Sequence, residues 1–198
     1  MKTTTIKITV FLFAFISMTV TFGQTATDYL NLAKPILFDK MVYKLTWSAH
    51  PTDNYFKQEY ISTSDNPEKF KRLLTFDVLI GNQELKDKKK KKVEELKDLK
   101  QTDPIINYRV LEKGNEIMLD FVLGGYSADG KSLNIIERNV YRYTLLNKNT
   151  LKGILLFAVS DRAYGNEIDD FLSDLKNNQL DLLNAVTAFH IPEITVSK

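Results

Sequence analysis

The sequence of 198 residues contains no cysteine, so it can form no disulfide, no thiol nucleophile and no lipid-modified N-terminal cysteine. Glycine and proline are also scarce, at 8 and 5 residues. These low counts exclude a collagen-like chain, and the 43% hydrophobic content excludes a disordered one. The remaining class is an ordinary globular protein, for which we expect a single domain.

The first 23 residues have the pattern of a secretory signal peptide. Lys2 and Lys7 precede an uncharged run over residues 8–22, and Gly23 supplies a small residue before the expected cleavage site. The run is 15 residues long, whereas a membrane-spanning helix needs roughly 20. We therefore predict cleavage after Gly23 and a periplasmic or secreted protein that is neither a lipoprotein nor a membrane-spanning one. The alternative is an uncleaved N-terminal anchor.

An excess of charge of one sign is also lacking once that segment is removed. Loss of Lys2 and Lys7 leaves 25 basic and 25 acidic residues. Nucleic-acid binding requires a basic face, so we expect no nucleic-acid partner. The remaining imbalance is local, because residues 84–100 hold 8 Lys and 5 acids whereas residues 161–198 hold 7 acids and 3 bases.

Hydrophobic periodicity predicts an antiparallel α+β domain. Alternating or continuous apolar runs predict strands over residues 41–48, 55–61, 74–80, 107–111, 116–124, 133–146 and 153–160. Helical spacing predicts two long helices, over residues 83–101 and 168–186, and shorter helices after Pro67 and, as a helix or an arm, over residues 26–35. Because most strands are joined by short turns, we predict an antiparallel sheet covered on both faces by helices. The domain is expected to span residues 27–192, with a tail over residues 193–198.

Two resemblances accompany this prediction. The strings YFKQEY at residues 55–60 and SDRAYG at residues 160–165 are similar to those of uncharacterised small secreted proteins of Gram-negative bacteria. The order of the predicted elements resembles the PsbP-like α/β/α sandwich, a fold of secreted and envelope accessory proteins. These resemblances imply a location and an architecture, and neither implies a reaction.

Motifs of the common enzyme classes are missing. The chain has no GxSxG elbow, P-loop, HExxH or GxGxxG motif. It has only two histidines, His50 and His190, so a three-histidine zinc site is impossible. We expect no metal and no cofactor, and we interpret His190 as a structural residue at the end of a helix.

His50 is the weak catalytic candidate. It lies at a strand end in the string SAHP, where a loop can present an imidazole to a cleft. A small hydrolase or lyase that pairs His50 with Glu59 or Asp161 is therefore one hypothesis. The alternative is a histidine that Pro51 holds in a hairpin turn.

Charged residues inside apolar strands form the second group of candidates. Asp120 and either Arg138 or Arg142 fall in adjacent predicted strands, so cross-strand ion pairs are expected. Alternatively, Arg138 and Arg142 share a strand face and can bind a small anionic ligand, together with Asp161 and Arg162 after the most apolar strand.

Two surfaces are candidates for partner binding. Tyr55 and Tyr60 belong to a hairpin expected at a sheet edge, where exposed tyrosines can anchor a partner. The run Lys88, Lys89, Lys90, Lys91, Lys92 is either a solvated helix face or a patch for an anionic surface or an acidic partner. Taken together, the sequence favours a non-enzymatic binding or accessory module of the cell envelope over the two alternatives.

Overall fold

The structure, a computed structural model, describes residues 26–32, 35–148 and 151–197. The predicted signal peptide and its cleavage site lie outside the described residues. Within those described ranges, no helix is long and apolar enough to cross a membrane.

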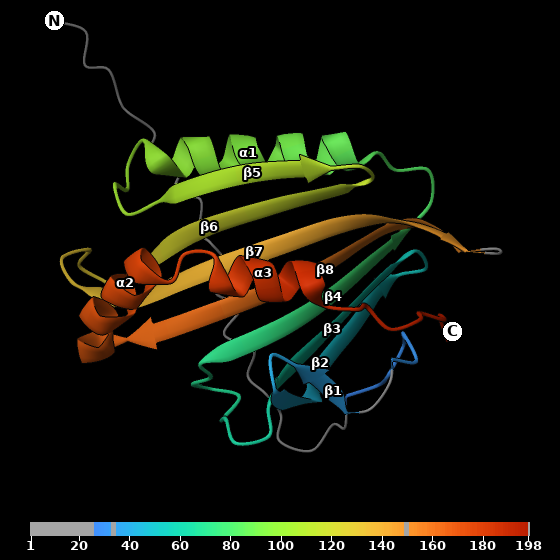
Figure 1. Cartoon of the computed structure of the whole chain (residues 1–198), viewed down its shortest axis with the longest axis horizontal. Helices are drawn as coiled ribbons and strands as arrows, with labels where there is room; N and C mark the ends of the chain where they lie inside the picture. Colours follow the sequence, from blue (N-terminus) through green and yellow to red (C-terminus); the bar gives the residue numbers. More distant parts are fainter. Residues whose placement is uncertain (1–25, 33–34, 149–150, 198) are drawn as a thin grey trace, which may run out of the picture.

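An antiparallel sheet of eight strands dominates the described part of the chain (Figure 1). The strands lie in the order β1-β2-β3-β4-β8-β7-β6-β5. Their bounds are β1 Ile36–Phe38, β2 Met41–Thr52, β3 Tyr55–Ser62, β4 Arg72–Ile80, β5 Asn107–Lys113, β6 Glu116–Tyr126, β7 Leu133–Lys148 and β8 Leu151–Tyr164. The sheet consists of two four-stranded meanders, and pairing of β4 with β8 joins them. The antiparallel sheet of the sequence prediction is confirmed.

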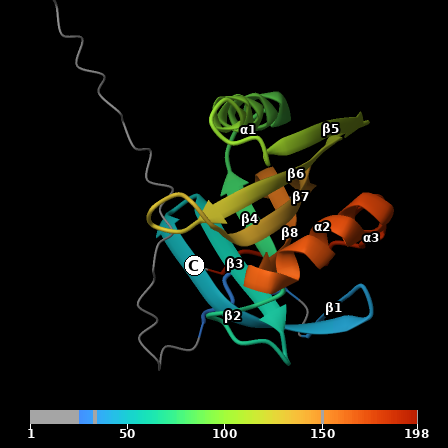
Figure 2. The same ribbon diagram turned by 90° about the vertical axis from the view of Figure 1, so that its left-hand side faces the viewer.

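The alternating side chains of β8 show how the helices lie on the sheet. Ile154 belongs to a hydrophobic cluster with Leu85 and Leu96 of α1, which spans Leu85–Lys100. The next residue, Leu155, belongs to a second cluster with Leu182 and Leu183 of α3, which spans Asp181–Ala188. Because successive strand residues point to opposite faces, α1 and α3 lie on opposite sides of the sheet (Figure 2).

The predicted α/β/α sandwich, with helices covering both faces, is nevertheless wrong. The described residues form mainly the single sheet, and the three α-helices among them are short. α1 packs on β5, β6 and β7, and α3 packs on β7, so each covers only part of its face. Segments without helix cover much of the rest, because Leu30, Leu32 and Ile194 pack in one cluster with Phe56 and Tyr60 of β3.

The predicted helix over residues 168–186 is divided into two. α2 spans Ile168–Asn177, after a 3-10 turn at Gly165–Glu167, and α3 starts at Asp181. The carbonyl oxygen of Gln179, between them, accepts hydrogen bonds from Arg138 at 2.5 Å and Arg109 at 3.0 Å. These bonds from the sheet hold the carbonyl outside the helical ladder, so the hydrophobic period continues while the helix does not.

The short helix predicted after Pro67 is also absent. After Pro67 the chain makes turns closed by an isolated bridge between Asn66 and Lys69, and the Asn66 side chain accepts the Glu68 N–H at 2.9 Å. This local bond competes with helix formation. Described residues 26–32 form an arm rather than a helix.

The two ends of the described chain lie side by side. The Thr195 N–H donates to the Leu30 carbonyl at 3.2 Å, and the Ser197 N–H donates to the Tyr29 carbonyl at 2.9 Å. The Leu30 N–H in turn donates to the buried Gln58 side chain at 2.7 Å. The C-terminal segment is therefore part of the packed structure.

Candidate functional site

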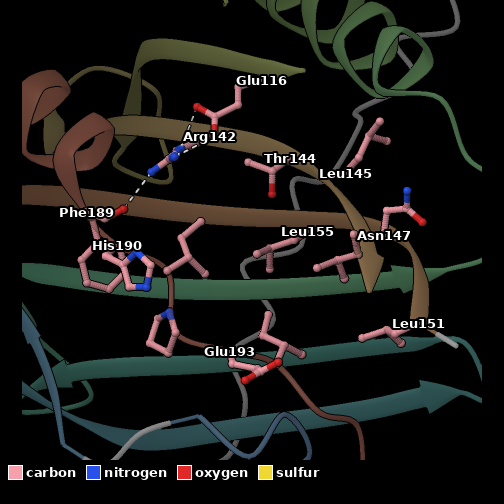
Figure 3. A pocket seen from close by; sticks show the side chains of 14 residues that line it. Glu116, Arg142, Thr144, Leu145, Asn147, Leu151, Leu155, Phe189, His190 and Glu193 are labelled. Carbon is pink, nitrogen blue, oxygen red and sulfur yellow. Dashed lines mark hydrogen bonds and ion pairs between the residues drawn. The ribbon is translucent and has the colours of Figure 1, made fainter. Parts of the chain in front are cut away.

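A pocket of about 440 Å³ lies between the sheet and the segment that follows α3 (Figure 3). β6, β7 and β8 form one wall, and residues 189–194 form the other. This volume is within the range of roughly 300–1,000 Å³ that small-molecule sites occupy. This pocket is our candidate functional site.

The segment 189–194 forms a wall because α3 stops before it. Phe189 has an extended backbone, with φ −65° and ψ 122°, and Pro192 cannot continue a helix. Arg142 of β7 holds the helix end, since its Nη1 donates to the carbonyls of Val186, Thr187 and Phe189 at 3.2, 3.3 and 2.9 Å. A cation at the C-terminal end of a helix is favoured by the helix dipole. Arg142 thus fixes the start of the pocket wall.

The lining of the pocket is mixed, and apolar residues outnumber polar ones. Eight of its fourteen residues are apolar: Leu145, Leu146, Leu151, Leu155, Phe189, Ile191, Pro192 and Ile194. Among the described residues, the lining side chains of Thr144, Asn147 and His190 have no hydrogen-bond partner. The pocket therefore offers an apolar interior and three polar groups with unused hydrogen-bonding capacity.

Three charged residues line the pocket, Glu116, Arg142 and Glu193, and the first two pair with each other. Arg142 donates from Nη2 to Glu116 Oε1 at 2.7 Å and from Nε to Glu116 Oε2 at 3.2 Å. With the three helix carbonyls, these bonds occupy nearly all of its donors. An anion would have to displace Glu116 to be bound by Arg142.

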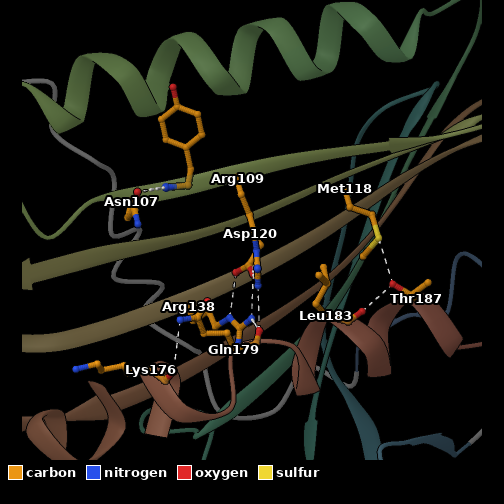
Figure 4. Close-up of polar contacts among 10 residues, drawn as sticks. Asn107, Arg109, Met118, Asp120, Arg138, Lys176, Gln179, Leu183 and Thr187 are labelled. Carbon is orange, nitrogen blue, oxygen red and sulfur yellow. Dashed lines mark hydrogen bonds and ion pairs between the residues drawn. The ribbon is translucent and has the colours of Figure 1, made fainter. Parts of the chain in front are cut away.

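Arg138, the other arginine proposed as an anion clamp, is buried in a charge network (Figure 4). It donates from Nε and Nη2 to Asp120 at 3.0 and 2.9 Å, while Arg109 donates to the same carboxylate at 2.8 and 2.5 Å. The expected cross-strand pair of Asp120 with Arg138 is confirmed. Arg142, four residues along the same face, binds Glu116 rather than Asp120.

Asp161 and Arg162 lie within β8 and not in a loop after it. Asp161 accepts two bonds from Arg72 of β4, at 2.5 and 2.8 Å. Arg162 pairs with Glu137 of β7 and lies 4.4 Å from the centre of the Phe70 ring. Arg162 faces the opposite side of the sheet from Arg138 and Arg142, because neighbouring positions of a strand alternate. Asp161 lies opposite Arg138 in the strand register, but it is bound by Arg72 while Arg138 binds Asp120, so the four residues do not form one site.

His50 is part of an aromatic cluster. Its ring stacks on Phe56 with centroids 4.0 Å apart, and Tyr29 lies at 5.5 Å. Its Nδ1 lies 3.1 Å from the Tyr55 carbonyl oxygen. Glu59 is not beside it, because Glu59 and Phe56 alternate on opposite faces of β3 and Glu59 pairs with Lys57 at 2.7 Å.

Asp161 is also far from His50. Tyr55, next to His50, pairs with Leu79 of β4, whereas Asp161 pairs with Arg72 at the other end of that strand. Seven residues of strand separate the two ends, about 23 Å at 3.3 Å per residue. The structure therefore does not assemble the catalytic pair that the hydrolase or lyase hypothesis requires.

The expectation that Tyr60 is exposed on an edge strand is wrong. β3 lies between β2 and β4, and Tyr60 is only 1% exposed in the core, where the Gln58 amide donates to its hydroxyl at 2.6 Å. Tyr55 is half-buried and donates to Asp77 Oδ2 at 3.1 Å. A partner surface made of both tyrosines is therefore excluded.

Asp77 of β4 is a charged residue that the sequence reasoning missed. Its Oδ1 is buried and, among the described residues, has no hydrogen-bond partner. Burial raises the pKa of Asp77 to about 6, although nearby Lys57 and the Tyr55 hydroxyl act in the opposite direction. The signal was present in the sequence, because Asp77 is the only charged residue between Leu73 and Ile80 of an otherwise apolar strand.

The lysine run lies on α1, as the sequence predicted, and its side chains point in different directions. Lys90 and Lys91 are exposed, whereas Lys88, Lys89 and Lys92 are half-buried. Lys89 pairs with Glu112 at 2.6 Å and Lys92 with Glu95 at 2.9 Å. The run is therefore not one continuous solvated patch.

A protein-family model matches residues 30–191 of this chain, which include most of the described structure. The comparison with curated proteins finds no match, and the comparison with solved structures finds none either. The resemblance to the PsbP-like sandwich is not confirmed. The chemistry of the site must therefore be argued from its own residues.

Proposed function

The chain belongs to an uncharacterised protein family over residues 30–191, and from this premise we propose that it is a non-enzymatic binding module for a small, largely apolar molecule. The pocket between β7, β8 and residues 189–194 is the binding site in this proposal. The single observation that carries it is the combination of volume and lining, about 440 Å³ with eight apolar residues among the fourteen that line it.

The polar groups of the pocket favour an uncharged or weakly polar ligand. In its ion pair, Arg142 and Glu116 already bind each other. Thr144, Asn147 and His190 lack hydrogen-bond partners among the described residues and can bind hydroxyl, carbonyl or amide groups of a ligand. A few polar groups in an apolar cavity are the usual way in which a protein orients such a ligand. These features support the binding proposal better than the alternative of an anion held by Arg138 and Arg142.

A fluorescence titration with the uncharged apolar dye N-phenyl-1-naphthylamine tests the pocket. Leu151→Trp places a large ring at the pocket lining, and we expect it to weaken dye binding at least about tenfold, equivalent to 1.4 kcal/mol. Leu180→Trp is the matched control, because Leu180 is 54% exposed in the link between α2 and α3 and does not line the pocket.

The control protein should bind the dye as the wild type does, and circular dichroism should show that both variants are folded. Absence of dye binding to the wild type, or equal binding by a folded Leu151→Trp variant, contradicts the proposal.

We place this function outside the cytoplasm. The support is the pattern of residues 1–23, with Lys2 and Lys7 before a short apolar run and Gly23 before the expected cleavage. Expression of the full chain in a Gram-negative bacterium should give a periplasmic or secreted product whose mass corresponds to residues 24–198. An intact chain that stays in the cytoplasm contradicts this part of the proposal.

A further inference from the structure

The lysines of α1 fall into two groups that the sequence does not separate. Lys89 and Lys92 form ion pairs with Glu112 and Glu95, and Lys92 also lies 5.0 Å from the centre of the Phe121 ring. The remaining exposed lysines of the helix are Lys86, Lys90, Lys91, Lys97 and Lys100. The first group fastens α1 to the sheet, and the second group is exposed. Lys88 is half-buried and belongs to neither group, and Lys100, at the end of the helix, also donates to Asn107 Oδ1 at 3.2 Å.

The solvent face of α1 carries only charged side chains. Beside the five exposed lysines it presents Asp87, Glu94 and Asp98, so its net charge is positive by two. The apolar residues of the helix, such as Leu85 and Leu96, are buried on the other side. This face therefore has no side chain that could insert into an apolar environment.

The helices on the two sides of the sheet carry opposite net charges. α1 holds eight lysines and four acids, for a net charge of +4. Residues 165–188, which include α2 and α3, hold five acids and one lysine, for a net charge of −4. Because α1 and α3 lie on opposite sides of the sheet, the field of the protein turns α1 toward a negatively charged body (Figure 2).

The composition of this face distinguishes between two kinds of anionic partner. The energetic centres of protein interfaces are aromatic, apolar or arginine side chains, and lysine is depleted in them. An exposed helix face that contains only lysine, aspartate and glutamate lacks such a centre. Lysines can contribute to binding of a charged lipid surface without any apolar contact. The face therefore suits lipid headgroups better than an acidic protein.

We propose that the solvent face of α1, centred on Lys86, Lys90 and Lys91, docks the protein peripherally on the surface of an anionic lipid bilayer. Binding is electrostatic and places α1 along the membrane surface, with α2 and α3 on the far side of the sheet. It is independent of the pocket, which lies on the other side of the sheet from α1.

Vesicle co-sedimentation tests this proposal. The wild-type protein should bind phosphatidylglycerol-containing vesicles at about 0.05 M salt, and binding should be lost at about 0.5 M salt, where screening shortens the reach of the charges. It should not bind vesicles of phosphatidylcholine alone. The variant K86E/K90E/K91E should bind at least roughly a hundredfold more weakly, since each lysine near such a surface contributes about fivefold.

The matched control is K40E/K44E/K131E, which changes net charge by the same amount at three exposed lysines away from α1. It should bind nearly as well as the wild type. Circular dichroism and thermal unfolding establish that both variants are folded, and the milder K86Q/K90Q/K91Q should show an intermediate affinity. No binding by the wild type at low salt, binding that survives high salt, or equal loss in both charge-reversal variants overturns the proposal.

Discussion

At the scale of single residues, Asp77 makes the stability of the fold depend on pH. Its folded-state pKa is about 6, above the ordinary value of 3.8, because burial disfavours the carboxylate. Between these two values the folded protein binds more protons than the unfolded chain does. The free energy of unfolding therefore falls as the pH rises through this window. The loss of stability caused by ionising Asp77 is fully present above about pH 6.

Asp77→Asn removes this titration while keeping the shape of the side chain. The interval between 3.8 and about 6 corresponds to about 3 kcal/mol of unfolding free energy. We expect the stability of the variant relative to the wild type to rise by up to that amount between about pH 4 and pH 7.5. Urea unfolding at a series of pH values measures it.

Asp53→Asn is the control for that series, because Asp53 is exposed in the turn between β2 and β3. This variant removes one exposed carboxyl group and so controls for the change in net charge. A difference between the Asp77→Asn variant and the wild type that stays constant from acid to neutral pH would mean that Asp77 titrates as an ordinary exposed carboxyl does.

The residue scale also shows which contacts a sequence can predict. Strand alternation and the order of the meander were enough to predict an ion pair of Asp120 with either Arg138 or Arg142, and the structure shows Arg138. The partners of Arg142 were not accessible in this way, because three of its acceptors are carbonyls at the end of α3, which reaches β7 only through the tertiary fold. The exposure of Tyr60 was also predicted wrongly. The prediction placed β3 at a sheet edge, whereas β3 pairs with β2 on one side and with β4 on the other.

At the scale of elements, local periodicity identified most strands and the helix α1. It failed at the division between α2 and α3, where apolar residues continue at helical spacing through Leu182, Leu183 and Val186. The cause is not local, because Arg109 and Arg138 reach Gln179 from two strands. β1 was missed as well, because three residues are too few to show a period.

Asp120→Asn tests how strongly the charge network of Asp120, Arg109 and Arg138 joins β5, β6, β7 and the link between α2 and α3. The change leaves two guanidinium groups around a neutral amide, and the side chain of Arg138 is only 6% exposed. Breaking a buried ion pair from one side typically costs about 3–5 kcal/mol, so we expect a loss in that range. The urea midpoint at unchanged m-value measures it.

Glu112→Gln provides the comparison, because it removes a single Lys89–Glu112 ion pair in which Glu112 is 50% exposed. Its loss should be below about 1 kcal/mol. Equal losses for the two variants would show that burial of the Asp120 network does not determine its contribution.

At the scale of the whole molecule, the sequence predicted an antiparallel sheet but not what covers it. Two long amphipathic patterns suggested two helical layers, yet the pattern at residues 168–186 gives two short helices. Residues 29–32 and 189–196 fill part of the space instead, and such segments have no periodicity by which they could be recognised. The pocket, which depends on the position of residues 189–194, could not be predicted for the same reason.

The meeting of the two chain ends also constrains the order in which the protein folds. The carbonyl groups of Leu30 and Tyr29 accept hydrogen bonds from the N–H groups of Thr195 and Ser197. Arg72 forms its ion pair with Asp161, which lies 89 residues later in the chain. Contacts so distant in sequence form slowly. While the polypeptide is being synthesised from its N-terminus, the first meander has neither its central neighbour nor its C-terminal cover. The first meander can therefore complete its packing only after β8 and the C-terminal segment have been made.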